Sequence, residues 1–202
     1  MNPDRRFTLA ITGASGAMYA TRTLAALLER GCHVELIVSE YGRRLLRDEL
    51  GEAAMVDRLD AYLEATYGDG IRAGRWTVHS NKDLGAKIAS GSQDSEGMVV
   101  VPCSMKTLAG IAHGLSRNLV ERAADVMLKE RRPLIIVPRE TPMSLPQLRN
   151  MVLCAEAGAL MMPAMPAFYQ MPKTLEDLSS FMAGKILAAL GFRHELYPAW
   201  KG

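Results

Sequence analysis

The chain has 202 residues, of which 49% are hydrophobic and 23% carry a charge. This length and composition fit one globular domain, residues 1–202, with enough apolar side chains for a sizeable core. Lys and Arg number 24 and Asp and Glu number 22, which leaves a net charge of +2. Chains that bind nucleic acid or anionic membranes usually carry a clear basic surplus, so we expect neither kind of partner.

Cysteine and histidine usage argues against disulfides and metal sites. The three cysteines, Cys32, Cys103 and Cys154, are odd in number and show no Cys-x-x-Cys spacing. The four histidines fit no metal-ligand spacing, so we expect no bound metal. Residues 1–7 carry no apolar signal region, and no later run is long enough to span a bilayer. We therefore expect a cytoplasmic protein in a reducing compartment.

The first elements alternate between strand and helix. Residues 7–12 form a short apolar run that predicts a strand, and residues 18–30 show helical spacing that stops at Gly31. Residues 33–38 predict a second strand, and residues 41–49 predict a charged helix. This alternation is typical of a parallel sheet whose strands are joined by helices.

The rest of the chain continues this pattern. The remaining predicted elements are a helix around residues 56–67, strands at 75–79, 97–102, 134–138 and 159–162, a helix that opens within residues 102–110, a helix at 121–132, and a closing helix at 174–190. Two of these strands are continuously apolar, as expected when helices cover both faces of a sheet. Thr174 with Asp177 three residues later resembles a capping box at the start of the closing helix.

Small and polar residues follow the predicted strands at their carboxyl ends, where a parallel sheet binds its ligand. These positions are Gly13 to Ala17, Ser39, Cys103 to Thr107, and Arg139 with Glu140. Hydroxyl groups, backbone N–H groups and the cations Lys106 and Arg139 suit a phosphate group. The sequence therefore indicates a phosphorylated cofactor.

The loop from Gly13 to Ala17 is the most suggestive of these segments. Its glycines allow a tight turn and leave amide groups at the start of the next helix, where the helix dipole favours an anion. The spacing differs from Gly-x-Gly-x-x-Gly because Ser15 takes the third position, and no Gly-Lys-Ser/Thr follows as in a P-loop. An ordinary tight turn is the alternative interpretation.

Four further candidates also have structural interpretations. Ser104 and Thr107 suit anion contact, or helix capping alone. Glu140 suits proton transfer, or a cap. Tyr169 suits donation to a phosphate, or ordinary packing in its Met- and Pro-rich loop.

Two other features favour a structural interpretation on sequence alone. Cys103 has no histidine beside it in the sequence, so we interpret it as a packed side chain rather than a nucleophile. Arg122 and Lys129 are seven residues apart and share one helix face, with Asp125 between them. This spacing favours a surface ladder of ion pairs through Asp125.

Eight segments together carry a family likeness. They are Thr12 to Ala17, Ser39, Glu49, Ser90 to Ser92, and residues 102–107, 121–133, 137–142 and 166–169. Over nearly the whole chain they closely resemble the UbiX/Pad family of flavin prenyltransferases. The resemblance implies a three-layer α/β/α sandwich with a mostly parallel sheet, Rossmann-like or flavodoxin-like. It also implies a homo-dodecamer with FMN bound between subunits.

The resemblance also assigns binding residues. For FMN it implies contacts from Gly13, Ala14, Ser15, Ser39, Ser104, Met105, Lys106, Thr107 and Arg139. For dimethylallyl monophosphate it implies contacts from Gly91, Arg122, Lys129, Tyr169 and Lys185. Many relatives have Arg where this chain has Lys185. Lysine keeps the charge but loses the planar fork, so we expect a weaker or more adaptable grip on phosphate there.

The activity implied is transfer of the dimethylallyl group to N5 and C6 of reduced FMN, which gives prenylated FMN for a UbiD-type decarboxylase. Arg122, Lys129 and Lys185 would stabilise the departing phosphate. The residues implicated in catalysis are Ser15, Glu49, Lys129 and Glu140. Trp200 would cover the site, or simply help to dock the tail. No Asp-Asp-x-x-Asp stretch is present to hold magnesium, which agrees with a metal-independent reaction of a monophosphate.

Three alternative functions remain open at this point. A flavin-dependent cysteine decarboxylase of the same fold should carry a Pro-x-Met-Asn-x-x-Met-Trp string, which this sequence lacks. A direct aromatic-acid decarboxylase is the second alternative. The third is an FMN-binding accessory protein of such a decarboxylase.

Overall fold

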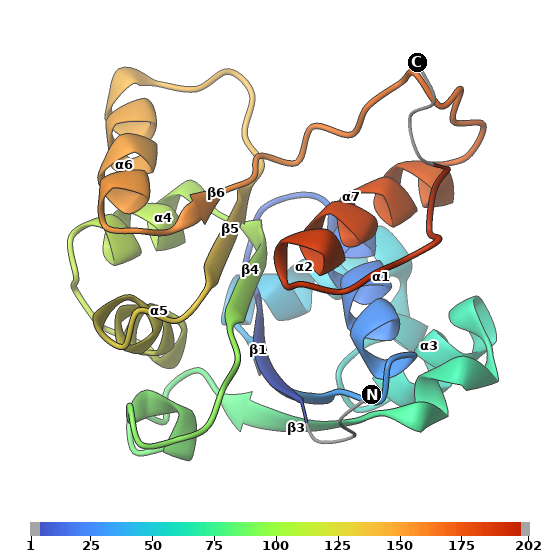
Figure 1. Ribbon diagram of the computed structural model, residues 1–202, viewed down its shortest axis with the longest axis horizontal. Coiled ribbons are helices and arrows are strands. Elements are labelled where there is room, and N and C mark those ends of the chain that lie inside the picture. The colour runs from blue at the N-terminus through green and yellow to red at the C-terminus, as the bar shows by residue number, and fades with distance from the viewer. Residues whose placement is uncertain (1–4, 199–202) are drawn as a thin grey trace.

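A parallel sheet of six strands forms the centre of the molecule in the computed structural model, which describes residues 5–198 (Figure 1). The strands are β1 (Arg6–Ile11), β2 (His33–Val38), β3 (Arg75–Ser80), β4 (Met98–Cys103), β5 (Leu134–Pro138) and β6 (Leu160–Met161). They lie in the order β3-β2-β1-β4-β5-β6, and each neighbouring pair is parallel. The predicted parallel sheet is confirmed.

Helices cover both faces of this sheet. The α-helices are α1 (Ala17–Leu28), α2 (Glu40–Leu50), α3 (Leu59–Tyr67), α4 (Met105–Ala112), α5 (Leu119–Lys129), α6 (Leu145–Glu156) and α7 (Leu175–Ala189). Three short 3₁₀ helices are η1 (Glu52–Ala54), η2 (Asp69–Ala73) and η3 (Lys87–Ala89). In Figure 1, α4, α5 and α6 lie on one side of the strands, and α1, α3 and α7 lie on the other. The predicted α/β/α sandwich is therefore confirmed.

Two apolar cores explain why the central strands read as continuous apolar runs. Alternate residues of a strand point to opposite faces. On β1, Leu9 and Ile11 join the core that contains α1 and α7, whereas Ala10 joins the core that contains α4 and α5. Every residue of β4 is buried, as expected when both faces are covered.

Helix α6 is the one α-helix that the sequence did not predict. Its outward side carries Leu145, Leu148 and Val152, whose exposed fractions are 59%, 44% and 55%. Only Cys154 on this helix is fully buried. Because apolar residues lie on both sides of α6, its sequence shows no clear helical period. A start signal was present, however, because Gln147 accepts the backbone N–H of Ser144 and Pro146 lies in the first turn.

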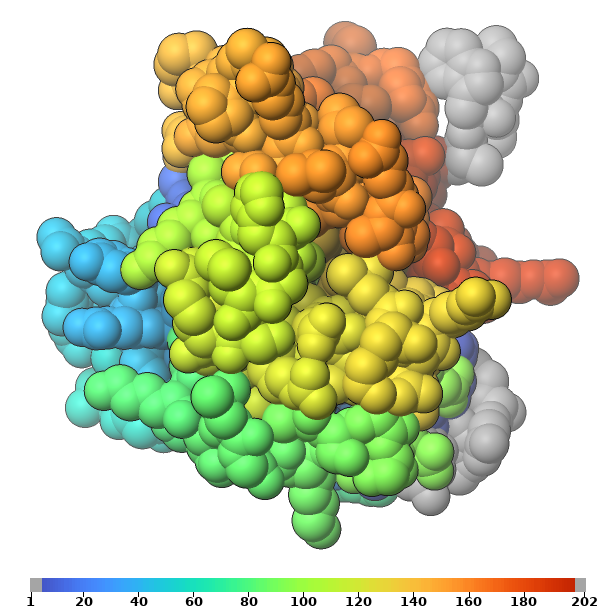
Figure 2. All heavy atoms as spheres, turned by 90° about the vertical axis from the view of Figure 1, so that its left-hand side faces the viewer, coloured from blue at the N-terminus to red at the C-terminus, as the bar shows by residue number. Residues whose placement is uncertain are grey.

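Figure 2 looks onto the face formed by α4, α5 and α6. The segment around α6 and β6 (orange) makes the upper part of this face, and residues 80–97 (green) make the lower part. Helices α4 and α5 lie between them. Within residues 5–198, no helix has the length and apolar character needed to cross a lipid bilayer.

The strand order reverses between β1 and β4, and this is where the site is positioned. Parallel sheets bind ligands beyond the carboxyl ends of their strands at such a switch point. The hydroxyl of Thr12 donates to the carbonyl of Pro102 at 2.8 Å and accepts the backbone N–H of Ser104 at 2.7 Å. These two bonds hold the loop after β1 against the loop after β4.

Candidate functional site

A cavity of about 270 Å³ lies at the carboxyl ends of β1, β2, β3 and β4. The residues that line it are Gly13, Ser39, Glu40, Tyr41, Asn81, Ser104, Lys106, Thr107, Asn118, Val120 and Glu121. They come from the loops after β1 and β3 and from the first turns of α2, α4 and α5. We call this cavity the helix-end pocket.

Each of the three helices starts with a side-chain cap. Ser39 accepts the N–H of Gly42 at 3.0 Å, Ser104 accepts that of Thr107 at 3.3 Å, and Asn118 accepts that of Glu121 at 3.1 Å. The first N–H groups of an α-helix have no acceptor within the helix. On α2 and α4 the caps leave the two N–H groups that precede the capped one for a ligand.

The charges of the helix-end pocket favour an anion. Helix N-termini carry partial positive charge, and those of α2 and α4 lie here beside the ammonium group of Lys106. The first N–H groups of α5 already donate to the carbonyl and side-chain oxygens of Asn81. Glu121 also lines the pocket, but its carboxylate is bound by the backbone N–H of Arg117 at 2.9 Å and by its guanidinium at 3.2 Å. The charge of this buried carboxylate is thus balanced. The arrangement suits a phosphate group.

Gly13 allows the close approach of β1 to α2. A Cβ at this position would lie 2.4 Å from the Cβ of Tyr41. Gly42 is required on the same interface, since its Cβ would lie 2.4 Å from the carbonyl oxygen of Ile11. The two glycines therefore set the distance between the loop and the start of α2.

The amides at the start of α1 have a partner within the chain. The carboxylate of Glu49 accepts the N–H groups of Gly16 and Ala17, at 2.9 Å and 2.8 Å. The sequence predicted that these amides would favour an anion, and the anion that occupies them is Glu49. A phosphate group is therefore better placed in the helix-end pocket than at the start of α1.

Ser15, Arg139 and Glu140 lie near this loop. The guanidinium of Arg139 donates to the backbone carbonyl of Ser15 at 3.2 Å, and the side chain of Ser15 is exposed. Burial raises the pKa of Tyr19, against the effect of Arg139 and with a smaller contribution from Glu49. Glu140 follows Arg139 directly and accepts the N–H of Thr141 at 3.0 Å. The structure thus groups the predicted residues that follow β1 and β5.

Gly91, Arg122 and Lys129 form a second group, on the α5 side of the sheet. A Cβ on Gly91 would lie 2.1 Å from a carboxylate oxygen of Glu130 and 2.9 Å from the Nζ atom of Lys129, so glycine leaves the space that this ion pair occupies. Arg122 donates to the carbonyl of Ala89 at 3.1 Å and to Asp125 at 2.7 Å. The predicted ion pair between Arg122 and Asp125 is confirmed.

The predicted ladder does not extend to Lys129. Its ammonium pairs with the neighbouring Glu130 rather than with Asp125. The hydrogen bond from Lys129 lowers the pKa of the exposed Glu130 carboxyl group.

Tyr169 and Lys185 form a third group, on the α7 side. The ring of Tyr169 lies 6.2 Å from that of Phe181, and the ammonium of Lys185 lies 5.8 Å from the same ring. Phe181 belongs to the apolar core of α1 and α7, whereas α5 packs in the other core. The predicted binding residues for the prenyl phosphate therefore lie on opposite faces of the sheet, and one chain does not bring all five together.

Other predictions have a clear place in the structure. Ala14 is buried, and Met105 begins α4 and packs partly buried against the core. Cys103 is fully buried, and burial together with the nearby Cys154 raises the pKa of its thiol well above the usual range. This agrees with a packed side chain, because the thiolate is the reactive form. Trp200 lies outside residues 5–198.

Six pocket residues were not predicted as part of the site. They are Glu40, Tyr41, Asn81, Asn118, Val120 and Glu121. The carboxyl-end rule pointed to Asn81, which directly follows β3. The sequence Asn118-Leu-Val-Glu121 is a helix-start pattern that also could have been used. Within residues 5–198, no group of three or more His, Cys, Asp or Glu side chains is placed to hold a metal ion.

Fold and pocket together define the class of protein. A doubly wound parallel sheet with helix N-termini gathered at its switch point is typical of proteins that bind phosphate-bearing cofactors. The family model described as Flavoprotein matches residues 1–187 of this chain.

Relatives narrow the class further. The chain is 45% identical over 194 residues to a flavin prenyltransferase UbiX from Halalkalibacterium halodurans, covering 96% of this chain and 92% of the relative. A solved structure described as AnUbiX (PadA1) in complex with FMN and dimethylallyl pyrophosphate is 37% identical with a TM-score of 0.87, over 98% of both chains. A dodecameric FMN-dependent UbiX-like decarboxylase from Escherichia coli O157:H7 is also 37% identical, with a TM-score of 0.84 over 98% of this chain and 100% of the other. This chain belongs to the UbiX family of flavin prenyltransferases.

Proposed function

We propose that this chain joins the dimethylallyl group of dimethylallyl monophosphate to N5 and C6 of reduced FMN and thereby makes prenylated FMN. The observation that carries the proposal is the helix-end pocket, where the N-termini of α2 and α4 lie beside Lys106 at the carboxyl ends of the strands. FMN ends in one phosphate monoester, which matches one pocket of about 270 Å³. When bound, reduced FMN supplies the nucleophilic nitrogen of the reaction.

The chain's own residues fit the flavin phosphate. Ser39, Ser104 and Thr107 carry hydroxyl groups at the starts of α2 and α4, and Lys106 adds a charge. Hydroxyl and amide donors that are fixed by helix caps cost little to order on binding. The proposed contacts with the rest of FMN come from Gly13, Ala14, Ser15, Met105 and Arg139.

The proposed role of the cations is to hold the prenyl phosphate and to stabilise the phosphate that leaves. Arg122, Lys129 and Lys185 supply three positive charges, and Gly91 leaves space for the ion pair of Lys129 with Glu130. Tyr169 would donate its hydroxyl to the same phosphate. Because the leaving group gains negative charge as the bond breaks, such cations lower the barrier of the chemical step.

We propose that polar side chains near the loop after β1 remove the proton from C6 of the flavin. Ser15, Glu49 and Glu140 lie around the loop after β1 and the end of β5, close to Arg139. Glu49 accepts two backbone N–H groups, so we propose that it holds the turn that carries Ser15 in place. We propose that Glu49 also takes part in the proton transfer. Lys129 completes the proposed catalytic set.

A shared active site follows from the split of the binding residues. Arg122 and Tyr169 lie on opposite faces of the sheet, so one prenyl phosphate reaches both only if they come from two copies of the chain. The loop that carries Tyr169 is also unusually apolar at its surface, with Met165 and Phe168 exposed by 66% and 71%. We propose a homo-oligomer, and the dodecameric relative from E. coli supports twelve subunits.

Three further assignments complete the proposal. Residues 1–202 act as a single flavin prenyltransferase domain. The protein works in the cytoplasm, and a UbiD-type decarboxylase receives the product. The dimethylallyl pyrophosphate in the AnUbiX complex shows that this relative accommodates the diphosphate, and we propose the monophosphate as the substrate of this chain.

Mass analysis of the flavin tests the proposal. The purified protein is incubated anaerobically with reduced FMN and dimethylallyl monophosphate. The molecular mass of the released flavin is then measured by mass spectrometry. We expect the flavin to gain one five-carbon prenyl unit, and Lys106→Ala to need more FMN for the same yield. Arg149→Gln on the exposed side of α6 is the matched control. Unchanged flavin mass together with carbon dioxide release from an aromatic or cysteinyl acid would show a decarboxylase instead.

A further inference from the structure

The buried ring of Phe181 lies next to two residues that the proposed function assigns to the prenyl phosphate. Phe181 belongs to α7, and its exposed fraction is 6%. The ring of Tyr169 meets this ring edge-on, at an interplanar angle of 84° and with 6.2 Å between the centroids. The Nζ atom of Lys185, about one helical turn further along α7, lies 5.8 Å from the same centroid. One ring therefore lies beside two groups that come from different parts of the chain.

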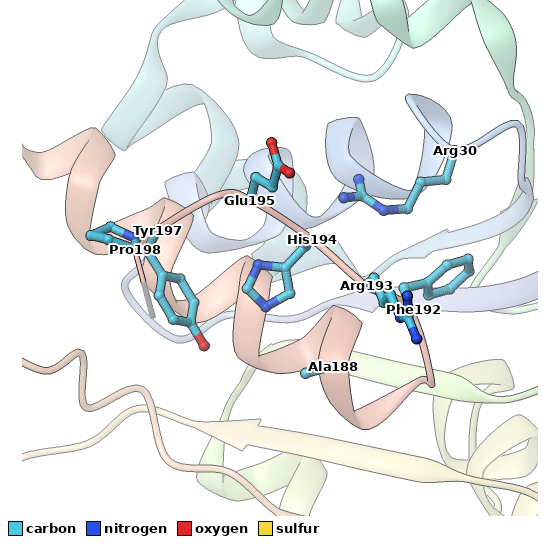
Figure 3. A pocket seen from close by; sticks show the side chains of 8 residues that line it. All are labelled: Arg30, Ala188, Phe192, Arg193, His194, Glu195, Tyr197 and Pro198. Atoms are coloured by element: carbon cyan, nitrogen blue, oxygen red, sulfur yellow. The ribbon is translucent and has the colours of Figure 1, made fainter. Parts of the chain in front are cut away.

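Residues 191–198, which we call the C-terminal segment, help to hold the ring of Phe181 in place. The ring of Tyr197 lies 4.7 Å from that of Phe181 and 4.8 Å from that of His194. Figure 3 shows His194 and Tyr197 side by side against α7. A Cβ on Gly184 would lie 2.5 Å from the ring of Tyr197, so this ring rests directly on the helix backbone. The position of Phe181 is thus fixed from α7 and from the C-terminal segment.

The loop that carries Tyr169 is tied to the same segment. The side-chain amide of Gln170 donates to the carbonyl of Pro198 at 2.9 Å. Gln170, Phe181 and Tyr197 also line one small cavity of about 170 Å³. The loop, the ring on α7 and the C-terminal segment therefore meet at one place, and the ring of Phe181 is part of what supports Tyr169.

An aromatic ring can restrain both of these neighbours before a ligand arrives. Edge-to-face contact is a favoured arrangement of two aromatic rings, and an ammonium group within about 6 Å of a ring is attracted to its face. Lys185 is exposed, so this attraction limits the positions that its long side chain takes up. Because lysine lacks the planar fork of arginine, its grip on a phosphate depends more on such support. A side chain that is ordered only on binding reduces the affinity.

We propose that Phe181 is a positioning residue for the prenyl phosphate and acts through Tyr169 and Lys185. This inference rests on the proposed function, which assigns those two residues to the substrate. The phenyl ring offers a phosphate no hydrogen-bond donor, so Phe181 is not itself a ligand. Its loss is expected to weaken substrate binding more than it slows the chemical step.

A matched control separates this role from packing alone, because Phe181 also belongs to the apolar core of α1 and α7. Phe7 lies in the same core, is fully buried, and pairs with Phe192 at 5.6 Å. Figure 3 shows Phe192 at the opposite end of the C-terminal segment from Tyr197. Phe7→Leu therefore removes a buried ring of the same core but leaves the rings around Tyr169 intact.

Calorimetry with oxidised FMN measures substrate binding without turnover, because oxidised FMN lacks the nucleophilic nitrogen of the reduced form. The FMN-loaded protein is titrated with dimethylallyl monophosphate. We expect Phe181→Leu to raise the Kd by roughly three- to tenfold, as when side chains must be immobilised on binding. Phe7→Leu is expected to leave the Kd unchanged, although both variants lower the midpoint of unfolding. With reduced FMN, the kcat of Phe181→Leu is expected to change by a smaller factor than the Kd.

A second background tests whether Phe181 acts through Lys185. In Lys185→Gln the ring has only Tyr169 left to position, so adding Phe181→Leu is expected to raise the Kd by a smaller factor than it does in the parent chain. Phe181→Met fills a similar volume without a ring, and it replaces Phe181→Leu in both backgrounds if that variant does not fold.

The outcomes distinguish this inference from the proposed function. A parent chain that does not bind dimethylallyl monophosphate would overturn the proposed function and this inference with it. If the parent chain binds, an equal rise of the Kd in Phe181→Leu and Phe7→Leu would overturn the positioning role alone. The same is true if Phe181→Leu raises the Kd by the same factor with and without Lys185, since a residue that acts only through core packing is indifferent to that ammonium.

Discussion

The absent side chain of Gly13 determines how closely the loop after β1 approaches α2. In Gly13→Ala, the new Cβ meets the Cβ of Tyr41 at 2.4 Å, and either the loop or the helix start must move. We expect a loss of about 1–3 kcal/mol in stability, as for other overpacked sites, and weaker FMN binding. Equilibrium unfolding and fluorescence titration of FMN measure the two effects.

The companion variants make this prediction specific. Tyr41→Gly removes the opposing Cβ and is expected to recover FMN binding in the Gly13→Ala background. Tyr41→Ala keeps that Cβ and is expected to recover nothing. Equal recovery by both would show that the ring of Tyr41, rather than its Cβ, causes the conflict.

Glu49 is a carboxylate on the N-terminus of α1. Its two bonds, to Gly16 and Ala17, satisfy amides that otherwise have no acceptor in the helix. We expect Glu49→Gln to lower the free energy of unfolding by about 1 kcal/mol, since the helix loses both a charge and one acceptor oxygen. Urea unfolding measures this effect without any turnover. Glu52→Gln, an exposed acidic residue in η1, is the control, and an equal loss there would contradict the assignment.

For single residues, the sequence predicted which kinds of side chain lie at the site better than it predicted their hydrogen-bond partners. Ser39 and Ser104 were expected near a phosphate, and they do cap the helices that line the pocket. Nothing in the local sequence pattern predicted that Glu49 would accept the amides of α1. That contact joins residues 33 positions apart, and local spacing carries no information about it.

Among the helices, α7 shows how a short capping sequence determines where a helix begins. Asp177 accepts the N–H groups of Lys173 and Thr174 at 2.8 Å and 2.9 Å, and Thr174 accepts that of Asp177 at 3.1 Å. The capping box predicted from the sequence is confirmed. The backbone hydrogen bonds from Lys173 and Thr174 lower the pKa of Asp177.

This shift makes the stability of α7 depend on pH. A carboxyl group whose pKa is lowered in the folded state stabilises the protein fully above its unfolded pKa, and this contribution is lost as the pH falls through the lower folded value. We expect Asp177→Asn to be less stable than the parent chain at about pH 6, with the difference shrinking toward about pH 2–3. Denaturant midpoints at both pH values measure it. A difference that stays constant with pH would show that the charge of Asp177 is not involved.

The sequence predicted correctly those strands that are buried along almost their whole length. Strands β1, β2, β4 and β5 are buried on both faces, so an apolar run was sufficient to find them. Helix α6 was missed because its exposed side is apolar, and β6 is shorter than predicted. Helical periodicity finds helices that have one apolar and one polar side, and α6 does not have that pattern.

Across the whole molecule, the proposed active site needs two copies of the chain. We therefore expect Arg122→Ala and Tyr169→Phe each to prenylate flavin poorly, and mixed oligomers of the two to recover activity. If the two variants mix at random, up to about a quarter of the active sites contain both a native Arg122 and a native Tyr169. Flavin prenylation after co-expression measures this recovery. Mixed oligomers with no more activity than either variant alone would place Arg122 and Tyr169 in the same chain's site.

How the chains assemble could not be predicted from local pattern. Arg122 on α5 and Tyr169 before α7 lie on opposite faces of the sheet, and only the folded structure shows this separation (Figure 1). Family resemblance implied a shared site, whereas the sequence spacing of these residues gave no sign of one. The topology of the sheet supplies the physical reason.

The helix-end pocket has a consequence for the lifetime of the protein in the cell. The N-termini of α2 and α4, each equivalent to about half a positive charge, line this pocket beside Lys106, and a bound anion offsets the repulsion among these charges. A bound phosphate also ties together α2 and α4, which are connected to both halves of the sheet. Ligand binding to the native state raises its resistance to unfolding by mass action. Flavin supply would then set both how fast this enzyme works and how much of it escapes degradation.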